Sequence, residues 1–189
     1  MPDTGARIRG EAINETSVNV GAKAGDNIQC LELGNSVLHQ TVLSLTSRQV
    51  TVANTTGASF GSTKLYGWPA GRIQLLGGVC NLSFDWAGQD IVATGSGDFS
   101  FGTTATADAT LNSTEVDLMA STAMLDPFVA GVGTGTGVFV VPTNFDGTTT
   151  AKDMYLNIII DDADVSDAAS DIVLVSGEVR FTWINLGDY

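Results

Sequence analysis

The sequence has little positive charge. It contains 8 lysine and arginine residues against 21 aspartate and glutamate residues, which gives a formal net charge of −13. A protein that binds nucleic acid must neutralise phosphates with lysine and arginine, so this balance argues against a nucleic-acid partner. It argues against an anionic membrane surface for the same reason. The sequence also lacks any run of about 18 apolar residues, so we expect no transmembrane helix.

Histidine and cysteine are nearly as scarce. Cys30 and Cys80 are too few for a disulfide scaffold, and we expect both to be buried, reduced thiols. A Ser/His/Asp triad would have to use His39, the single histidine, yet no G-x-S-x-G elbow accompanies it. We therefore expect His39 to be a partly buried strand residue. We also expect the protein to have no enzymatic activity and no cofactor.

The residues that are abundant favour strands and turns. Hydrophobic residues make up 43% of the 189 positions, threonine is as common as glycine, and long stretches of helix-forming residues are absent. We predict an all-β fold, an antiparallel β-sandwich or jelly-roll-like barrel with at most one short helix. Residues 1–27 are polar and irregular and are predicted to form an extended N-terminal arm. Residues 28–189 are predicted to form a single β-sandwich domain.

Alternation of apolar and polar residues marks the clearest strands. Near the C-terminus one parity is apolar (Val173, Val175, Val179, Phe181 and Trp183), which is typical of a half-buried antiparallel strand. In residues 71–88 the apolar parity switches across Gly77-Gly78. Such a switch predicts a β-bulge or sharp bend, by which the strand passes from one sheet to another.

Three other segments receive weaker interpretations. Residues 107–128 are the single candidate for a helix, with Asp126-Pro127 as its end. Residues 55–63 are predicted to form a loop. The run VAGVGTGTG (residues 129–137) lacks the spacing of a dinucleotide or phosphate loop, so we predict a flexible or tightly turning loop that leads into a strand.

The run IIIDDADVSDAASDIVLVSG (residues 158–177) places five aspartates between two apolar strands. Asp162, Asp164 and Ser166 match the first positions of a calcium loop, but Asp167 and Val173 occupy positions that require glycine and glutamate. A looser calcium site in a β-loop stays open as the minority interpretation. We favour an acidic loop that prevents register slip and edge pairing, at the tip of a C-terminal hairpin.

Three residues are candidates for docking on another molecule. Arg7 and Arg9 give the acidic chain a basic N-terminal arm, which is either a frayed terminus or a segment that docks on a neighbouring subunit or an acidic surface. Trp68 lies between glycines in LYGWPAG and is predicted to be exposed or interfacial. Trp86 and Trp183 follow the buried parity of their strands and are expected in the core.

Three stretches of the sequence carry a resemblance to a known group of proteins. They are residues 45–71 (LTSRQVTVANTTGASFGSTKLYGWPAG), residues 95–118 (GSGDFSFGTTATADATLNSTEVDL) and residues 145–189, which run from FDGTTTAKDMYLN to EVRFTWINLGDY. In composition and phrasing they resemble small acidic structural proteins of tailed bacteriophages. The similarity covers about three quarters of the chain, from Leu45 onward, and includes no active-site signature.

The resemblance implies a capsid decoration, or cement, protein. Such proteins commonly assemble as homotrimers on the outer capsid lattice, so the major capsid protein and the chain itself are the expected partners. The expected location is the capsid surface of the virion, after synthesis in the host cytoplasm. The alternatives are another virion component, such as a minor capsid, tail or fibre protein, or a carbohydrate-binding β-sandwich module.

Overall fold

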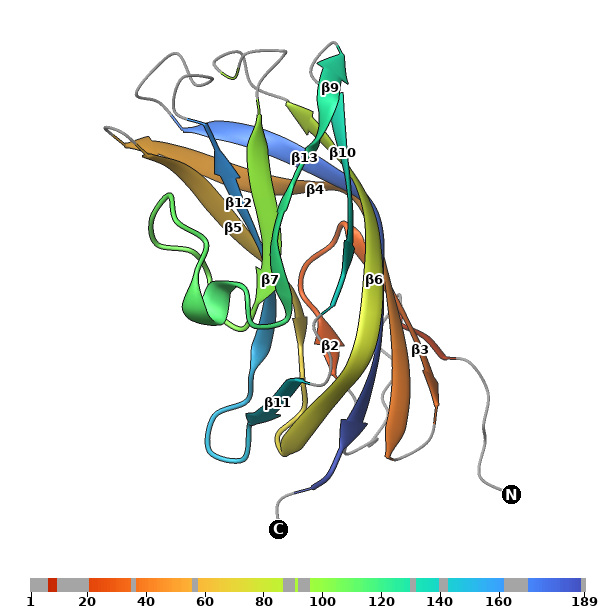
Figure 1. Cartoon of the computed structure of the whole chain (residues 1–189). Helices are drawn as coiled ribbons and strands as arrows, with labels where there is room; N and C mark the ends of the chain where they lie inside the picture. The colour runs from red at the N-terminus through yellow and green to blue at the C-terminus, as the bar shows by residue number, and fades with distance from the viewer. Residues whose placement is uncertain are drawn as a thin grey trace.

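A computed structural model of the chain describes residues 7–9, 21–34, 37–55, 58–86, 91, 96–129, 132–139, 143–161 and 170–187 (Figure 1). In these ranges the backbone forms thirteen β-strands and one 3-10 helix. The strands are β1 (Arg7–Arg9), β2 (Ala22–Lys23), β3 (Ile28–Gly34), β4 (Leu38–Thr55), β5 (Ala58–Gly67), β6 (Arg72–Trp86), β7 (Gly97–Gly102), β8 (Met119–Ala123), β9 (Leu125–Val129), β10 (Val132–Val138), β11 (Thr143–Asp146), β12 (Asp153–Ile160) and β13 (Asp171–Asn185). The helix is η1 (Ser113–Glu115). The all-β prediction is confirmed.

The strands belong to one antiparallel sheet that nearly closes into a barrel. Its main path runs β8-β7-β12-β5-β4-β13-β6-β10-β9. Because β8 and β9 follow each other along the chain, the two ends of this path lie near one another (Figure 1). The inner faces of opposite walls meet there, with Cys80 Sγ 3.8 Å from Met119 Sδ. The side chains that point inward make a single buried core.

Strand β13 confirms the alternation seen in the sequence. Val173, Val175 and Val179 are fully buried, as are Phe181 and Trp183, while the side chains between them face outward. Strand β13 has a partner on each edge, β4 on one and β6 on the other. A strand that lies centrally in the sheet and packs its odd-numbered side chains into the core fixes its register strongly.

Strand β6 contains the predicted β-bulge, which lies at Leu76, between Leu75 and Gly77. Leu75 pairs with Trp183 and Gly77 pairs with Thr182, so Leu76 is an extra residue, a β-bulge that exchanges the inward and outward parities. The predicted change of sheet is wrong. Strand β6 stays paired with β13 on both sides of the bulge, and its other edge pairs first with β11 and then with β10.

The glycine-rich run is a strand, where a loop was predicted. In β10, three glycines (Gly133, Gly135 and Gly137) point inward and alternate with outward-facing residues. A Cβ atom built on Gly135 would lie 2.4 Å from Phe99 Cε1, so the large ring on the opposite wall occupies that space. The absence of side chains along one face of β10 allows close approach of the walls.

Residues 107–128 do not form the predicted helix. Their structure is η1, β8, the start of β9 and a loop that lies on β12. Buried Asn157 holds this loop, because its side chain accepts from the Thr106 amide (3.0 Å) and donates to the carbonyls of Thr104 and Glu115 (both 3.0 Å). Side-chain hydrogen bonds to loop backbone compete with helix formation in a segment rich in threonine, serine and aspartate.

Strand β4 exchanges partners along one edge and so creates a fork. Residues His39 to Leu45 pair with β3, whereas Val52 to Thr55 pair with β5. The predicted loop over residues 55–63 is therefore wrong from Ala58 onward, where β5 begins. Because β3 and β5 diverge, the short strand β2 pairs with β5 at Gly67 and Tyr66. Inward-facing side chains beside this fork form the buried polar cluster described below.

The C-terminal strands do not form the predicted hairpin. Strand β12 pairs with β5 and β7, whereas β13 pairs with β4 and β6. In the strand order β5 and β4 lie between them, so the connection from Asp161 to Ser170 joins strands that are not neighbours. Local hydrophobic runs show which segments are strands, but they carry no information on which strands pair.

Candidate functional site: a buried acid–histidine cluster and an outer wall of low charge

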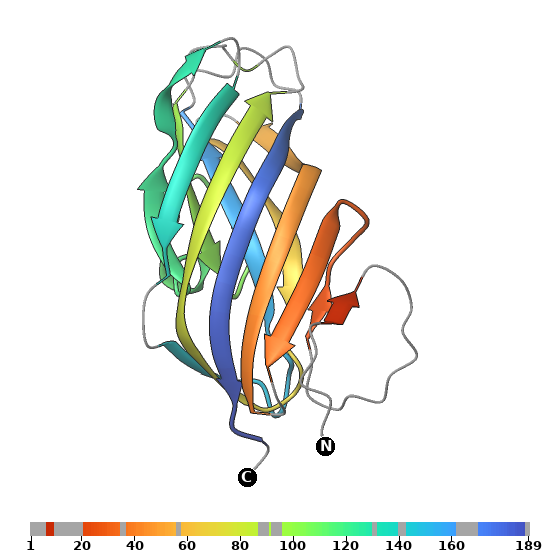
Figure 2. The same cartoon turned by 90° about the vertical axis from the view of Figure 1, so that its right-hand side faces the viewer.

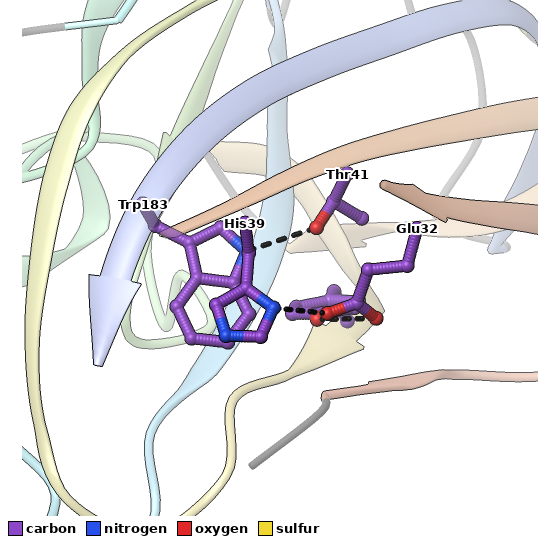
Figure 3. Close-up of polar contacts among 5 residues, drawn as sticks. Glu32, His39, Thr41 and Trp183 are labelled. Atoms are coloured by element: carbon purple, nitrogen blue, oxygen red, sulfur yellow. Dashed lines mark hydrogen bonds and ion pairs between the residues drawn. The ribbon is translucent and has the colours of Figure 1, made fainter. Parts of the chain in front are cut away.

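A cluster of polar and aromatic side chains lies in the core beside the fork. It consists of Glu32 on β3, His39 and Thr41 on β4, Tyr66 on β5 and Trp183 on β13. Glu32, His39, Thr41 and Trp183 have the inward parity of their strands. Tyr66 points inward because the register of β5 with β12 shifts by one residue, since Met154 pairs with Tyr66 and Tyr155 pairs with Lys64. All five residues are buried. Figure 3 shows four of them, with His39 between Glu32 and the Trp183 ring.

His39 connects the cluster. Its Nδ1 lies 3.1 Å from Glu32 Oε1, and the two side chains are only 4% and 6% exposed. The imidazole stacks on the Trp183 indole with a centroid separation of 4.1 Å and an interplanar angle of 11°. Trp183 Nε1 in turn donates to Thr41 Oγ1 at 2.9 Å (Figure 3). The contacts join β3, β4 and β13.

Tyr66 completes the cluster from the opposite side of the fork. Its hydroxyl donates to Glu32 Oε2 at 3.4 Å. Burial, reinforced by the nearby Glu32 carboxylate and the Cys30 thiol, holds the pKa of Tyr66 well above its usual value. The phenol is therefore neutral at physiological pH and remains a hydrogen-bond donor. Its ring packs edge-on against Phe181 at 5.3 Å.

The burial of the cluster limits what it can do chemically. A carboxylate beside an imidazole is the orienting half of a nucleophilic triad, but such a site must also admit a substrate. Here Glu32 and His39 are enclosed, and His39 Nε2 has no hydrogen-bond partner among the described residues. A network of buried polar groups that contact one another specifies one arrangement of strands. We interpret the cluster as a structural feature that connects β3, β4, β5 and β13 beside the fork.

The three residues of the calcium hypothesis, Asp162, Asp164 and Ser166, lie outside the described residues. The flanking aspartates are engaged, because Asp161 accepts a hydrogen bond from Ser96 and Asp171 accepts one from the Ile91 amide at 3.2 Å. Within the part of the chain that the structure describes, no group of three His, Cys, Asp or Glu residues is arranged to hold a metal ion.

The prediction that Trp68 is exposed is wrong. Its side chain is only 3% exposed and contacts Phe145 at 4.8 Å and Tyr66 at 5.6 Å between ring centroids. The glycines beside Trp68 in the sequence suggested a surface turn, but its ring belongs to the buried core. Trp183 is buried as predicted, and the side chain of Trp86 lies outside the described residues.

The two arginines of the arm belong to a strand. Arg7 pairs with Glu32 and Arg9 pairs with Cys30 in the backbone register between β1 and β3. Strand β2 ties a second segment of residues 1–27 to β5. Two segments of the predicted arm thus add to the sheet. The cysteine prediction is confirmed, since Cys30 and Cys80 are buried and do not form a disulfide.

Five strands form one broad face of the molecule, which we call the five-strand wall. Figure 2 shows β10, β6, β13, β4 and β3 side by side on this face. These strands contain four of the chain's 21 acidic residues, of which Glu32 and Asp171 are buried in the core. Asp85 and Glu178 are the other two. With three arginines on the same strands, the wall is far less acidic than the chain as a whole.

A row of mainly apolar side chains crosses the wall. It runs from Leu31 through Val42 and Arg180 to Val79 and Val138, each paired with the next on a neighbouring strand. Val138 is 70% exposed and Val79 is 51% exposed, whereas Val42 is only 8% exposed. Directly opposed side chains on one face of a sheet lie about 5 Å apart, so these residues make a continuous strip.

The next row of the wall is polar but almost uncharged. It contains Gln29, Ser44, Glu178, Asn81 and Thr136 in the same strand order. Arg180 and Glu178 therefore occupy the centres of adjacent rows on β13. Their side chains form an ion pair with a 2.9 Å separation between Arg180 Nη2 and Glu178 Oε1. Both are about half exposed, with 50% and 47% of each side chain accessible.

Comparison with known proteins gives no assignment. No protein-family model matches the chain, and no curated protein matches it either. In the described part of the chain, no helix is long and apolar enough to cross a membrane.

The sequence alone did not indicate the buried cluster or the five-strand wall. Glu32 shares its parity with the apolar residues Ile28 and Cys30, which was a signal that it points inward. Val79 and Val138 gave no such signal, because the bulge at Leu76 turns Val79 outward and the pairing of β6 with β10 is not local in sequence.

Proposed function

We propose that the protein is a structural component of a tailed-phage virion, a decoration protein that binds the outer head lattice and stabilises it. The observation that carries this proposal is the five-strand wall. A chain with a net charge of −13 keeps one broad face nearly free of acidic side chains and places exposed valines on it. Val79 and Val138 are directly opposed on neighbouring strands, and adjacent exposed apolar side chains are characteristic of a surface that another protein covers.

The mechanism is stabilisation by burial and by repetition. Apolar surface removed from water contributes about 25 cal/mol per Å². A capsid presents the same site many times, so a self-associated unit that contacts several subunits gains avidity without any single strong contact. In this proposal the major capsid protein and further copies of this chain, as a homotrimer, are the partners. The protein has no enzymatic role.

The N-terminal segment is the proposed contact with the capsid. Arg7 and Arg9 are two of the chain's 8 basic residues, and their pairing with β3 holds the segment at the edge of the five-strand wall. Charged groups at the rim of an interface mainly control association rate and orientation. We therefore expect the double variant Arg7→Glu/Arg9→Glu to bind capsids more slowly and with a weaker salt dependence.

The carbohydrate-binding alternative loses support. It requires an exposed aromatic platform, but Trp68 and Trp183 are both buried. The alternative virion locations, in the tail, a fibre or a minor capsid position, remain distinguishable by experiment.

Sedimentation with phage heads tests the proposal. Heads of the encoding phage from which the protein has been removed are mixed with the purified chain and pelleted. The proposal predicts that the chain pellets with the heads in a saturable manner and that the heads then resist heat and low ionic strength better. Binding to purified tails, with none to heads, would place the protein elsewhere in the virion. A chain that binds neither particle would contradict the proposed function.

A further inference from the structure

We propose that the five-strand wall binds a second copy of this chain. The inference goes beyond the proposed function, because a two-fold contact between walls joins copies in pairs and is therefore separate from the contacts within a homotrimer. It rests on that function only for the biological purpose of the contact. The occupant follows from charge, from the pattern of residues on the wall and from the size of the wall.

Charge restricts which faces of two identical copies can meet. Each copy carries −13, so most mutual orientations bring acidic side chains together and are repelled. The wall avoids this, because two of the four acidic residues on its strands, Glu32 and Asp171, point into the core. Asp98 on β7 and Asp153 on β12 lie on the opposite side of the strand order, whereas Asp126 on β9 and Asp146 on β11 lie on strands that pair with strands of the wall. Among the described strands, the wall therefore offers two copies a broad face with few acidic side chains.

The two central charges of the wall are self-complementary. Arg180 and Glu178 lie in adjacent rows on the same strand, with opposite signs. In a symmetric contact, residue i of one copy meets residue j of the other and the reverse. Arg180 of each copy can therefore exchange its intramolecular partner for Glu178 of the other. The uncharged side chains of both rows surround these exchanged pairs.

The wall is large enough for a stable interface. The strands β3, β4, β13, β6 and β10 contain 7, 18, 15, 15 and 7 residues, so at about 3.3 Å per residue and about 4.8 Å between strands they cover roughly 1,000 Å². A standard protein interface buries about 800 Å² on each partner, which is most of that area. The contact therefore extends beyond the two central rows.

Sedimentation velocity and light scattering of the full chain measure the association. At tens of micromolar the wild-type chain is expected to have at least twice the monomer mass of 19.6 kDa. The variants Arg180→Glu and Glu178→Arg each place like charges opposite one another, and each is expected to sediment as a monomer. The double variant Glu178→Arg/Arg180→Glu restores the complementary pattern and is expected to recover the wild-type mass.

Two comparisons make the test specific. Lys64→Glu is the matched control, because it also reverses one charge and breaks an intramolecular ion pair, Lys64–Asp153 at 2.7 Å, but on β5, outside the wall. It is expected to leave the association unchanged. Mixing the two single variants Arg180→Glu and Glu178→Arg is expected to restore association, because each then carries the charge that the other needs.

Defined results overturn the inference. It is wrong if the wild-type chain is monomeric at these concentrations, or if an oligomer forms that is unaffected by Arg180→Glu and Glu178→Arg while the fold is intact by circular dichroism. Failure of the proposed function looks different. An oligomer that responds to the wall variants but binds no phage particle retains the inference and removes the function, whereas a monomer that binds heads does the reverse.

Discussion

The buried pair of Glu32 and His39 allows a prediction with a definite order of effects. Replacing His39 with leucine keeps the approximate volume but removes the group 3.1 Å from the Glu32 carboxylate. The carboxylate is then buried with the Tyr66 hydroxyl, at 3.4 Å, as its remaining contact in the cluster. Breaking a buried pair by removing one partner costs about 3–5 kcal/mol. Loss of the stack on Trp183 adds about 0.5–1.5 kcal/mol.

The complementary variants are expected to be milder. Glu32→Gln keeps the shape of the side chain and a polar group beside His39, so its cost is that of one weakened buried hydrogen bond, about 1–3 kcal/mol. The double variant Glu32→Met/His39→Leu removes both polar groups and is expected to recover most of the stability lost in His39→Leu, because apolar replacements of a buried pair are often neutral. Thr51→Val, on the exposed face of the same strand, is the control and is expected within about 0.5 kcal/mol of wild type.

Equilibrium urea unfolding at pH 7, followed by tryptophan fluorescence, measures these differences as changes in the free energy of unfolding. The reasoning is refuted if the free energy of unfolding of His39→Leu lies within about 0.5 kcal/mol of the wild-type value, since a buried carboxylate without its partner is expected to destabilise the fold by more than that. It is also refuted if the double variant is destabilised by the sum of the effects of His39→Leu and Glu32→Met measured separately, because the two residues would then not interact.

Three further predictions concern other parts of the core. Gly135→Val should lower the free energy of unfolding by about 1–3 kcal/mol, because its Cβ meets Phe99, whereas Thr136→Val on the outer face should not. Burial raises the pKa of the Cys80 thiol to about 11, so Ellman's reagent at pH 8 should modify it only after unfolding, and rapid reaction of the native protein would contradict its burial. Burial also raises the pKa of Asp117, despite hydrogen bonds from Thr103, so the stability that its protonation contributes is present at low pH and lost as pH rises through the raised pKa. The free energy of unfolding of wild type relative to Asp117→Asn should therefore decrease from about pH 4 upward, and an increase would contradict the sign of the shift.

The sequence predicted the fold class because strand periodicity is a local property. The alternation from Val173 to Trp183 identified a strand buried on one face, and the parity change near Gly77 identified a bulge. Both signals depend on residues within one segment, where side-chain direction follows directly from backbone geometry.

The errors arose where a long-range contact determines the local structure. The glycines of β10 were assigned to a loop, because nothing nearby in sequence shows that Phe99 and Met119 occupy the space beside them. The hairpin of β12 with β13 was inferred from sequence proximity, but each strand pairs with segments about 50 or more residues away. Trp68 was placed on the surface because of its glycine neighbours, although Phe145 and Tyr66 enclose it.

The candidate surfaces were beyond sequence reasoning for the same reason. Each residue of the apolar row is ordinary in its own strand, and the row exists only because five separate strands align Leu31, Val42, Arg180, Val79 and Val138. The low charge of the wall likewise depends on which strands are neighbours. Pairing and register have to be known before such a surface can be recognised.

Electron microscopy of heads with and without the protein tests the central claim most directly. Heads lacking the protein are incubated with the purified chain and imaged, beside untreated heads from the same preparation. The account predicts additional density at regular positions on the outer lattice, absent from the untreated heads. Treated heads that are indistinguishable from untreated heads, at concentrations where the chain is folded and soluble, would contradict it.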